Sequence, residues 1–337
     1  MASGFTLTPR SVFAVLLLVG LGLVPLISGA LAQPFYVTLF TRILVFALAA
    51  LGLNLILGYG ALVSFGHAMY MGIGAYAVGI LAHHGVTNGW VQLGAAMVVG
   101  AAVALAVGLI CLRTTREGGG MAFIMITLAF AQMMFFLAVS LRAYGGDDGL
   151  PISVRSDFGL FSLQDPNTLY YLSYALLLAV LLGMRRLIDA RFGMVLRGCK
   201  SNERRMAALG FPTLRYKLAA YVISALVCVL AGMLLANLTR FVSPSYMAWT
   251  VSGELIVMIV LGGLGTLIGP VAGATALLLL EEVLSSLKFG LPWLDKLINQ
   301  HWLGLIGLFI VFVVLVMKRG VYGGLPAGLP TAKGRPK

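Results

Sequence analysis

Residues 43–57 read ILVFALAALGLNLIL, and Asn54 is the one strongly polar side chain among them. A helix that crosses about 30 Å of hydrocarbon needs roughly 20 mostly apolar residues, and this run reaches that length when it is extended to 38–57. Long apolar runs of this kind recur along the chain. They are continuous and lack the ten-residue alternation of a β-barrel, so they predict membrane-spanning helices.

The composition excludes a soluble protein. Of the 337 residues, 60% are hydrophobic and only 10% are charged, whereas about a quarter of a soluble domain is charged. The net charge of +12 is distributed in short blocks between apolar runs, which indicates orientation in a membrane and no binding of nucleic acid. The three cysteines, Cys111, Cys199 and Cys228, form no C-x-x-C pair and predict neither a disulfide framework nor a zinc site.

We expect an all-α polytopic membrane protein with about ten spans. Two of them are short, and the eighth and ninth are separated only by Gly269-Pro270, so these four could be broken or re-entrant. The first run ends in Ala30-Leu31-Ala32, which resembles a signal-peptide cleavage site, but its length favours an uncleaved helix. The expected spans are 12–31, 38–57, 66–82, 90–112, 121–141, 169–184, 218–237, 253–268, 270–287 and 301–317.

Lysine and arginine predict the orientation. The loop 185–217 holds nine of the 23 basic residues, and the tail 318–337 holds five more. With ten spans, both segments lie on the same side as Arg10, Arg113 and Arg116. The positive-inside rule then predicts cytoplasmic N- and C-termini.

The loop 185–217 contains a short predicted helix. Ser201 or Asn202 is placed to cap its start, Gly210 to stop it, and Pro212 to break the chain beyond it. Such a helix needs a surface to lie against, either anionic lipid or a cytoplasmic partner. Its apolar side chains are small, which favours a protein socket over the bilayer. The residues expected to contact the partner are Arg197, Glu203, Arg204, Ala207, Ala208, Leu209 and Gly210.

The loop 142–168 carries two adjacent aspartates, Asp147 and Asp148, among glycines. They could bind a cation, dock a soluble partner or lie in a solvated turn. Calcium takes six to eight oxygen ligands, and no third carboxylate is close in sequence. We therefore expect docking of a partner.

Two glycine-rich stretches, 58–79 and 262–273, interrupt apolar runs. Paired segments of this kind point to a transport path, and small residues also let helices pack closely. Gly265, Gly269 and Gly273 are spaced by four, which places them on one helix face if the helix is continuous. With Gly262, they are the predicted helix-packing glycines.

Polar residues inside spans are costly and suggest function. We expect Ser64, His67, Tyr76 and Glu254 near the transport path or its gates. The alternatives are a helix-end histidine bonded to a carbonyl for His67 and an interfacial carboxylate for Glu254. Glu281 and Glu282 are expected to be structural or interfacial.

Motifs for chemistry are missing from the sequence. It has no G-x-x-x-x-G-K-[ST] phosphate loop, no H-E-x-x-H and no G-x-S-x-G, so no nucleotide site, metal site or nucleophile is predicted. We expect no enzyme and no cofactor in this chain. Uphill transport would draw energy from an ion gradient or from another subunit.

Seven segments together resemble the permease subunits of branched-chain amino acid ABC importers, more specifically the LivM type. They extend over roughly residues 40–320, and the last of them is specific on its own. The segments are 60–68 (GALVSFGHA), 72–76 (GIGAY), 202–204 (NER), 208–210 (ALG), 215–218 (RYKL), 241–244 (FVSP) and 260–270 (VLGGLGTLIGP).

The resemblance implies a type II permease bundle, similar to the vitamin B12 importers, in the bacterial inner membrane. It implies four kinds of partner: a second, LivH-like permease, two cytoplasmic ATPases that bind the ATP, a periplasmic binding protein and membrane lipid. The loop 185–217 would then couple to an ATPase, and Asp147 and Asp148 would help to seat the binding protein. Related permeases carry urea, short amides or aromatic acids, and a secondary transporter, a channel or a membrane enzyme are further alternatives.

Overall fold

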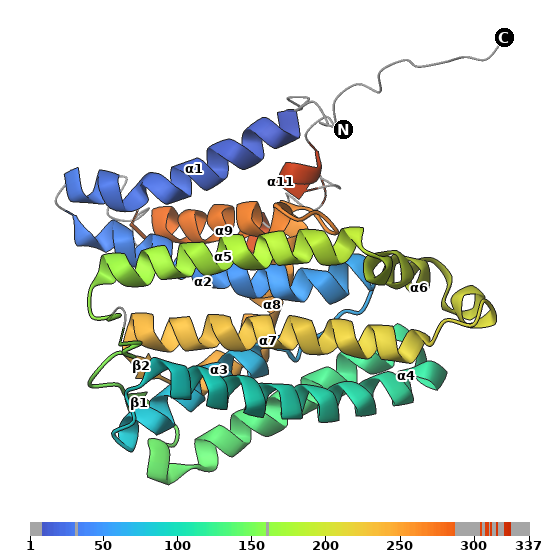
Figure 1. The fold of residues 1–337 in the computed structure, drawn as a ribbon, viewed down its shortest axis with the longest axis horizontal. Helices are drawn as coiled ribbons and strands as arrows, with labels where there is room; N and C mark the ends of the chain where they lie inside the picture. The colour runs from blue at the N-terminus through green and yellow to red at the C-terminus, as the bar shows by residue number, and fades with distance from the viewer. Residues whose placement is uncertain are drawn as a thin grey trace.

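The computed structural model describes residues 9–30, 33–159, 162–286, 304, 307–309, 311, 315 and 320–324. Long helices run side by side through this part of the chain, and they form one elongated bundle (Figure 1). Its one sheet is an antiparallel pair of two-residue strands, β1 (Leu150–Pro151) and β2 (Phe241–Val242). The chain is thus an all-α polytopic membrane protein.

Six apolar stretches in the described residues are long enough to cross a membrane. Three helices are shorter than these stretches or less apolar: α3 (His67–His83), α8 (Trp249–Gly262) and α9 (Gly269–Ser286). A single turn, α11 (Gly320–Gly323), lies near the C-terminus. The six long stretches are α1 (Pro9–Ala30), α2 (Pro34–Asn54) with the π-helical turn η1 (Leu55–Tyr59), Gly89–Thr115 and Gly120–Ser140 of α4 (Gly89–Ser140), α5 (Pro166–Asp189) and α7 (Thr213–Thr239).

The two halves of α4 lie antiparallel. Tyr221 of α7 stacks against Phe123, and a methyl group on Gly108 would meet the same tyrosine ring. A straight helix would separate positions 108 and 123 by about 22 Å, so the chain must reverse between them. Val99 and Met134 also line one cavity, as this reversal requires.

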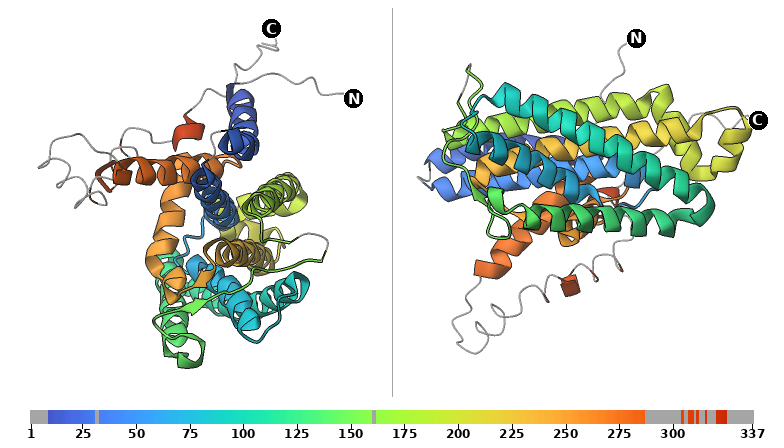
Figure 2. Two further views of the ribbon diagram at one scale, coloured as in Figure 1. Left: turned by 90° about the vertical axis from the view of Figure 1, so that its left-hand side faces the viewer. Right: turned by 90° about the horizontal axis from the view of Figure 1, so that it is seen from below.

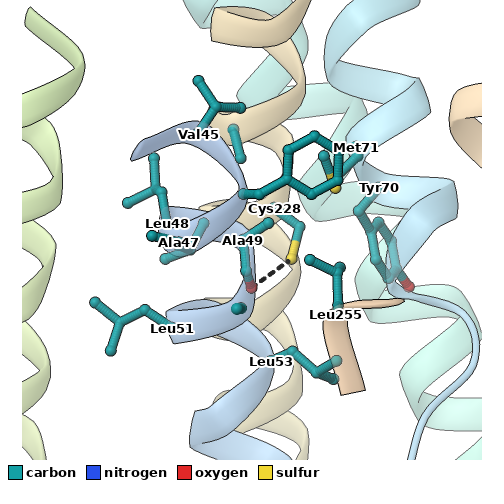
Figure 3. Packing of buried hydrophobic residues seen from close by; sticks show 14 of the residues in the cluster. Val45, Ala47, Leu48, Ala49, Leu51, Leu53, Tyr70, Met71, Cys228 and Leu255 are labelled. Atoms are coloured by element: carbon teal, nitrogen blue, oxygen red, sulfur yellow. Dashed lines mark hydrogen bonds between the residues drawn. The ribbon is translucent and has the colours of Figure 1, made fainter. Parts of the chain in front are cut away.

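Helix α2 forms the centre of the bundle. It lies between α5 and α9, with α7 on a third side (Figure 2). Its residues from Ile43 to Ile56 are almost all fully buried, which explains why this stretch carries no polar face. Cys228 of α7 donates from its thiol to the Ala49 carbonyl at 3.6 Å within this core (Figure 3).

Glycine allows α3 and α7 to approach closely. A methyl group on Gly232 would lie 1.8 Å from the Met71 carbonyl oxygen, and one on Gly74 would lie 2.1 Å from that of Val229. Both neighbours are backbone atoms, so side chains could not move aside to make room. Such close backbone contact is how membrane helices gain dispersion energy in the absence of a hydrophobic driving force.

The two polar loops lie at opposite ends of the bundle. Helix α6 (Arg191–Ala208) lies at one end, and β1 and β2 lie at the other (Figure 1). At the α6 end, Arg10 donates from Nη2 to the Gly323 carbonyl at 2.9 Å. The first turn of α1 and α11 are therefore in contact, although they lie at opposite ends of the sequence.

The structure corrects two boundaries and one inference about glycines. The expected span 253–268 is wrong beyond Gly262, where α8 ends, and 169–184 is too short because α5 continues to Asp189. Gly265 lies in the turn between α8 and α9 with φ +72°, so it cannot share a helix face with Gly269 and Gly273. Most of the expected span 301–317 and of the tail 318–337 lies outside the described residues.

Candidate coupling surface and transport path

Helix α6 consists of two parts separated by a break at Asn202. The backbone there is extended, with φ −159° and ψ 102°, and the Asn202 side-chain oxygen accepts a hydrogen bond from the Arg205 amide at 2.9 Å. This is N-cap geometry, in which a side chain satisfies an amide of the first turn. The predicted cap is confirmed, with Asn202 rather than Ser201 as the capping residue.

The end of α6 is also as the sequence predicted. Gly210 has φ +86°, the left-handed conformation that glycine adopts without strain. Its amide donates to the Ala207 carbonyl at 3.0 Å, and the Phe211 amide donates to that of Met206 at 3.2 Å. These two bonds form a Schellman motif, which ends the helix sharply and satisfies its last carbonyls.

The second part of α6 presents its predicted contact residues to the exterior. Leu209 is 66% exposed, and Arg204, Ala207, Ala208 and Gly210 are exposed as well. A hollow of about 400 Å³ lies beside them and is lined by Asn202, Glu203, Arg204, Ala207 and Thr213. We call this exposed surface, residues 204 and 207–210 with the adjoining hollow, the α6 knob.

Arg197 and Glu203 make contacts inside the chain. Arg197 donates to the carbonyl of Ile188 at 3.2 Å and to that of Gly193 at 3.3 Å. Glu203 pairs with Lys217 of α7 at 2.5 Å, and the lysine side chain is only 13% exposed. These contacts hold α6 against α5 and α7, a role that the sequence did not indicate.

Helix α3 begins in the middle of the bundle, after a partly buried segment without helical structure. A helix start inside a membrane protein leaves amide groups without partners, and no water is available to them. Hydroxyl groups from three directions satisfy them here: Phe65 N donates to Thr127 at 3.3 Å, Gly66 N to Ser64 at 3.2 Å, and Ala68 N to Ser252 at 2.9 Å.

His67 links the same region to α7. Its ring nitrogens lie 3.0 Å from the Ser64 hydroxyl and 2.9 Å from that of Ser224, which in turn donates to the Gly52 carbonyl at 2.6 Å. Ser64, His67 and Ser224 are all completely buried. His67 is therefore a bridge between α3, α7 and α2, bonded to hydroxyls and not to a carbonyl.

Tyr76 lines an apolar cavity of about 300 Å³. Among the described residues, its hydroxyl is the one buried side-chain polar atom without a hydrogen-bond partner. The cavity lies between α3 and the two halves of α4, and Met247 of the short helix η3 (Pro244–Met247) closes one side. Its other lining residues are Ile73, Ala77, Ile80, Leu81, Ala95, Val99, Met134, Leu137, Ala138 and Leu141.

Glu254 is exposed on α8. Arg42 of α2 and Glu281 of α9 are close enough to interact with it electrostatically. Charged groups inside membrane segments face a protein neighbour or water and not lipid. This face of α2, α8 and α9 is consequently a poor surface for contact with lipid tails.

The two glycine-rich stretches meet at the α6 end. A methyl group on Gly58 would lie 2.7 Å from the Gly265 amide nitrogen, and one on Gly262 would lie 1.7 Å from the Gly269 carbonyl oxygen. A methyl group on Gly273 would lie 1.8 Å from the Met258 carbonyl oxygen. Asn54 crosses this junction, because it accepts from Gly265 N at 3.3 Å and donates to the Thr266 carbonyl at 2.8 Å.

Asp147 and Asp148 are exposed in a turn at the opposite end of the bundle. Gly145, Gly146 and Gly149 around them all have positive φ, which is why this turn contains three glycines. Within the described residues, no group of three or more His, Cys, Asp or Glu is placed to hold a metal ion.

Arg155 is a structural residue that sequence reasoning missed. Its guanidinium donates to the carbonyls of Asn237 at 2.8 Å, Leu163 at 3.1 Å and Gln164 at 2.9 Å. Burial, with Arg240 nearby, lowers the pKa of Arg155 from its ordinary value. The arginine caps the end of α7 and ties the 150–165 loop to it, so this end of the bundle has a braced surface.

Comparison with known proteins identifies the class. The family model described as "Branched-chain amino acid transport system / permease component" matches residues 35–318. The chain belongs to this family, and it is a membrane-spanning permease subunit of a transport system.

The chain is similar to permease proteins of two names. The high-affinity branched-chain amino acid transport system permease protein LivM of Escherichia coli is 26% identical over 340 residues, which cover 92% of this chain and 76% of LivM. LivM of Salmonella typhimurium gives the same values. The permease protein LivH of Escherichia coli is 23% identical over 82% of this chain and 91% of LivH. No solved structure matches the chain.

The LivM-type resemblance is therefore confirmed. The LivM alignments cover more of this chain at a higher identity than the LivH alignments do. The similarity to both names also indicates that this family supplies permeases of two kinds.

Proposed function

We propose that this chain is one half of the membrane channel of an ATP-driven importer for branched-chain amino acids. A LivH-like permease would form the other half, two cytoplasmic ATPases would supply the energy, and a periplasmic binding protein would deliver the solute. The observation that carries the proposal is the α6 knob: a capped, sharply ended helix with an exposed leucine at one end of a membrane bundle. The relatives' names support the substrate class.

We further propose ten spans in a type II bundle in the inner membrane, with both termini in the cytoplasm. The contact between Arg10 and Gly323 at the α6 end supports termini on one side. The basic residues of α6 and of the 185–217 region lie at this same end. Positive charge near membrane segments favours the cytoplasmic side, which orients the α6 knob toward the ATPases.

The α6 knob would seat in a groove of an ATPase. Leu209 and the alanines would fill the groove, and Arg204 would contact its polar rim. Glu203 and Arg197 would keep α6 fixed on the bundle, since Glu203 pairs with Lys217 of α7 and Arg197 donates to the Ile188 carbonyl of α5. A knob held in this way can transmit force, because it cannot slide on its own subunit.

The transport path would run past Tyr76, between α3 and the two halves of α4, and past Glu254 on the face of α2, α8 and α9. The cavity beside Tyr76 is lined almost wholly by apolar side chains, which suits an aliphatic side chain better than urea or a short amide. The exposed Glu254, with Arg42 near it, offers charges of both signs, as an amino acid requires. Ser64 and His67 would lie behind the path and hold the start of α3 in place.

Asp147 and Asp148 would help to seat the binding protein. They are exposed at the end of the bundle opposite α6, on a turn next to the segment that Arg155 braces. Two exposed carboxylates on this turn favour docking of a partner with basic residues.

The test is to purify the tagged chain with its neighbouring gene products and to reconstitute the complex in liposomes. We expect a complex with two ATPases and a second permease, and ATP-dependent uptake of radiolabelled leucine that exceeds uptake of urea or phenylalanine. The proposal would be refuted by leucine uptake that is supported by this chain alone and does not depend on ATP.

A further inference from the structure

Lys200 connects α6 to the centre of the bundle. Its ammonium group donates to the Gly58 carbonyl at 2.7 Å in a partly buried position. Gly58 lies in the last turn of the helix formed by α2 and η1, and the last carbonyls of a helix have no partner within it. A lysine at such an end is doubly favourable, because it satisfies a carbonyl and opposes the negative end of the helix dipole.

Gly58 also contacts the turn between α8 and α9. A methyl group on Gly58 would lie 2.7 Å from the Gly265 amide nitrogen, and one on Gly265 would lie 3.3 Å from the Gly58 carbonyl oxygen, so the two backbones are in close contact. Asn54, one turn before Gly58, holds the same turn through Gly265 N and the Thr266 carbonyl. Asn54 is 1% exposed, so losing these bonds would leave a buried amide without partners, which is costly.

The contacts between Lys200 and α8 run through the turn η1. The turn η1 is a π-helix, a rare form that often marks functional sites in helices. The first part of α6 carries Lys200, and the second part, beyond the break at Asn202, carries the α6 knob. Two sets of contacts connect Lys200 to the turn before α9: Lys200 with Gly58 and Gly58 with Gly265, and, one helical turn away, Asn54 with Gly265 and Thr266.

We propose that Lys200 and Asn54 are positioning residues that transmit the movement of α6 to the α8–α9 turn and so to the face of Glu254. We call them the relay. This inference rests on the proposed function, because it assumes that an ATPase moves the α6 knob. It adds two residues that are required for coupling through their contacts within the permease.

The experiment compares variants of the full importer complex in liposomes. Lys200→Met keeps the length of the side chain and removes the donor, and Lys200→Arg restores a cationic donor. Asn54→Asp keeps an acceptor for Gly265 N but cannot donate to Thr266 when ionised. Arg191→Met is the matched control, because it also removes one positive charge from α6. The exposed Arg191 side chain makes no hydrogen bond or ion pair in the described part of the chain.

Three readouts are recorded for each variant: ATPase retention on the complex, ATP hydrolysis stimulated by leucine-loaded binding protein, and leucine transported per ATP. We expect Lys200→Met and Asn54→Asp to retain the ATPases and hydrolyse ATP while leucine transported per ATP falls at least fivefold. Lys200→Arg should recover most of the ratio, and Arg191→Met should match the wild type. The wild-type ratio in either relay variant that assembles would overturn the relay.

A labelling measurement separates a relay from a merely structural role. Leu264 is 53% exposed in the α8–α9 turn, and Leu264→Cys can be labelled with a water-soluble maleimide. We expect its labelling rate to differ between nucleotide-free and ATP-trapped complexes, and to lose this difference in Lys200→Met. A preserved difference would contradict the relay. If the wild-type complex holds no ATPase at all, it is the proposed function that fails.

Discussion

Replacing Leu209 by aspartate tests the α6 knob, and the exposed fraction of Leu209 sets the expected loss of binding free energy. Complete burial of a leucine stabilises by about 1.5–3 kcal/mol. Leu209 is 66% exposed, so docking can still bury about two thirds of it, which contributes about 1–2 kcal/mol. An aspartate loses this contribution and also buries a carboxylate without a partner. A total loss of roughly 2–4 kcal/mol corresponds to about 30- to 1,000-fold weaker binding of the ATPase.

The assay is the affinity of detergent-solubilised permease for the purified ATPase, with uptake of leucine measured in parallel. Leu209→Met is the control, because it nearly preserves volume and apolar character and should bind within a few-fold of wild type. Since Leu209 is exposed, Leu209→Asp should change the free energy of unfolding of the permease itself by only about 0.5 kcal/mol. Wild-type affinity and uptake in a folded Leu209→Asp variant would refute the reasoning.

Three further predictions concern the interior and the opposite end. Gly262→Ala should lower the thermal stability of the permease by about 1–3 kcal/mol or prevent assembly, because the added methyl group meets the Gly269 carbonyl. Gly183→Ala is the control, because Gly183 has open space around it. Equal melting temperatures for the two variants would contradict this packing. His67→Leu should cost about 1–3 kcal/mol in thermal unfolding by removing both of its hydroxyl bonds, and an unchanged melting temperature would exclude this bridge. Asp147→Asn with Asp148→Asn should weaken binding of the binding protein about 2- to 10-fold at low salt and leave ATPase binding intact; calcium-dependent transport that these changes abolish would instead indicate a metal site.

Local features were predictable where neighbours in sequence determine them. The apolar stretch around residues 43–57 predicts a membrane-spanning helix by length and hydropathy alone, but not its burial at the centre of the bundle. The cap at Asn202 and the stop at Gly210 follow from what those side chains can do for a helix end. These features depend on contacts within about six residues, which a single sequence contains.

The remaining features depend on partners that are distant in sequence. The Ser224 hydroxyl that meets His67 is 157 residues away, and the Gly58 carbonyl that meets Lys200 is 142 residues away. Neither distance has a signature in one sequence, so His67 was predicted near a path and Lys200 was only one basic residue among nine. The prediction that Gly265 shares a helix face with Gly269 and Gly273 was wrong for a related reason. A spacing of four residues does not show whether the chain between them is helical, and the positive φ of Gly265 is visible only in the structure.

The proposed function requires that this permease receives force from an ATPase at the α6 knob. The most direct measurement is photo-crosslinking from a benzoylphenylalanine placed at position 209 in the intact, transport-active complex, with position 182 of α5, where Leu182 is 59% exposed, as the control. We expect a covalent adduct with the ATPase from position 209 and none from position 182. A transport-active complex in which position 209 crosslinks only to lipid, or to the permease itself, would contradict it.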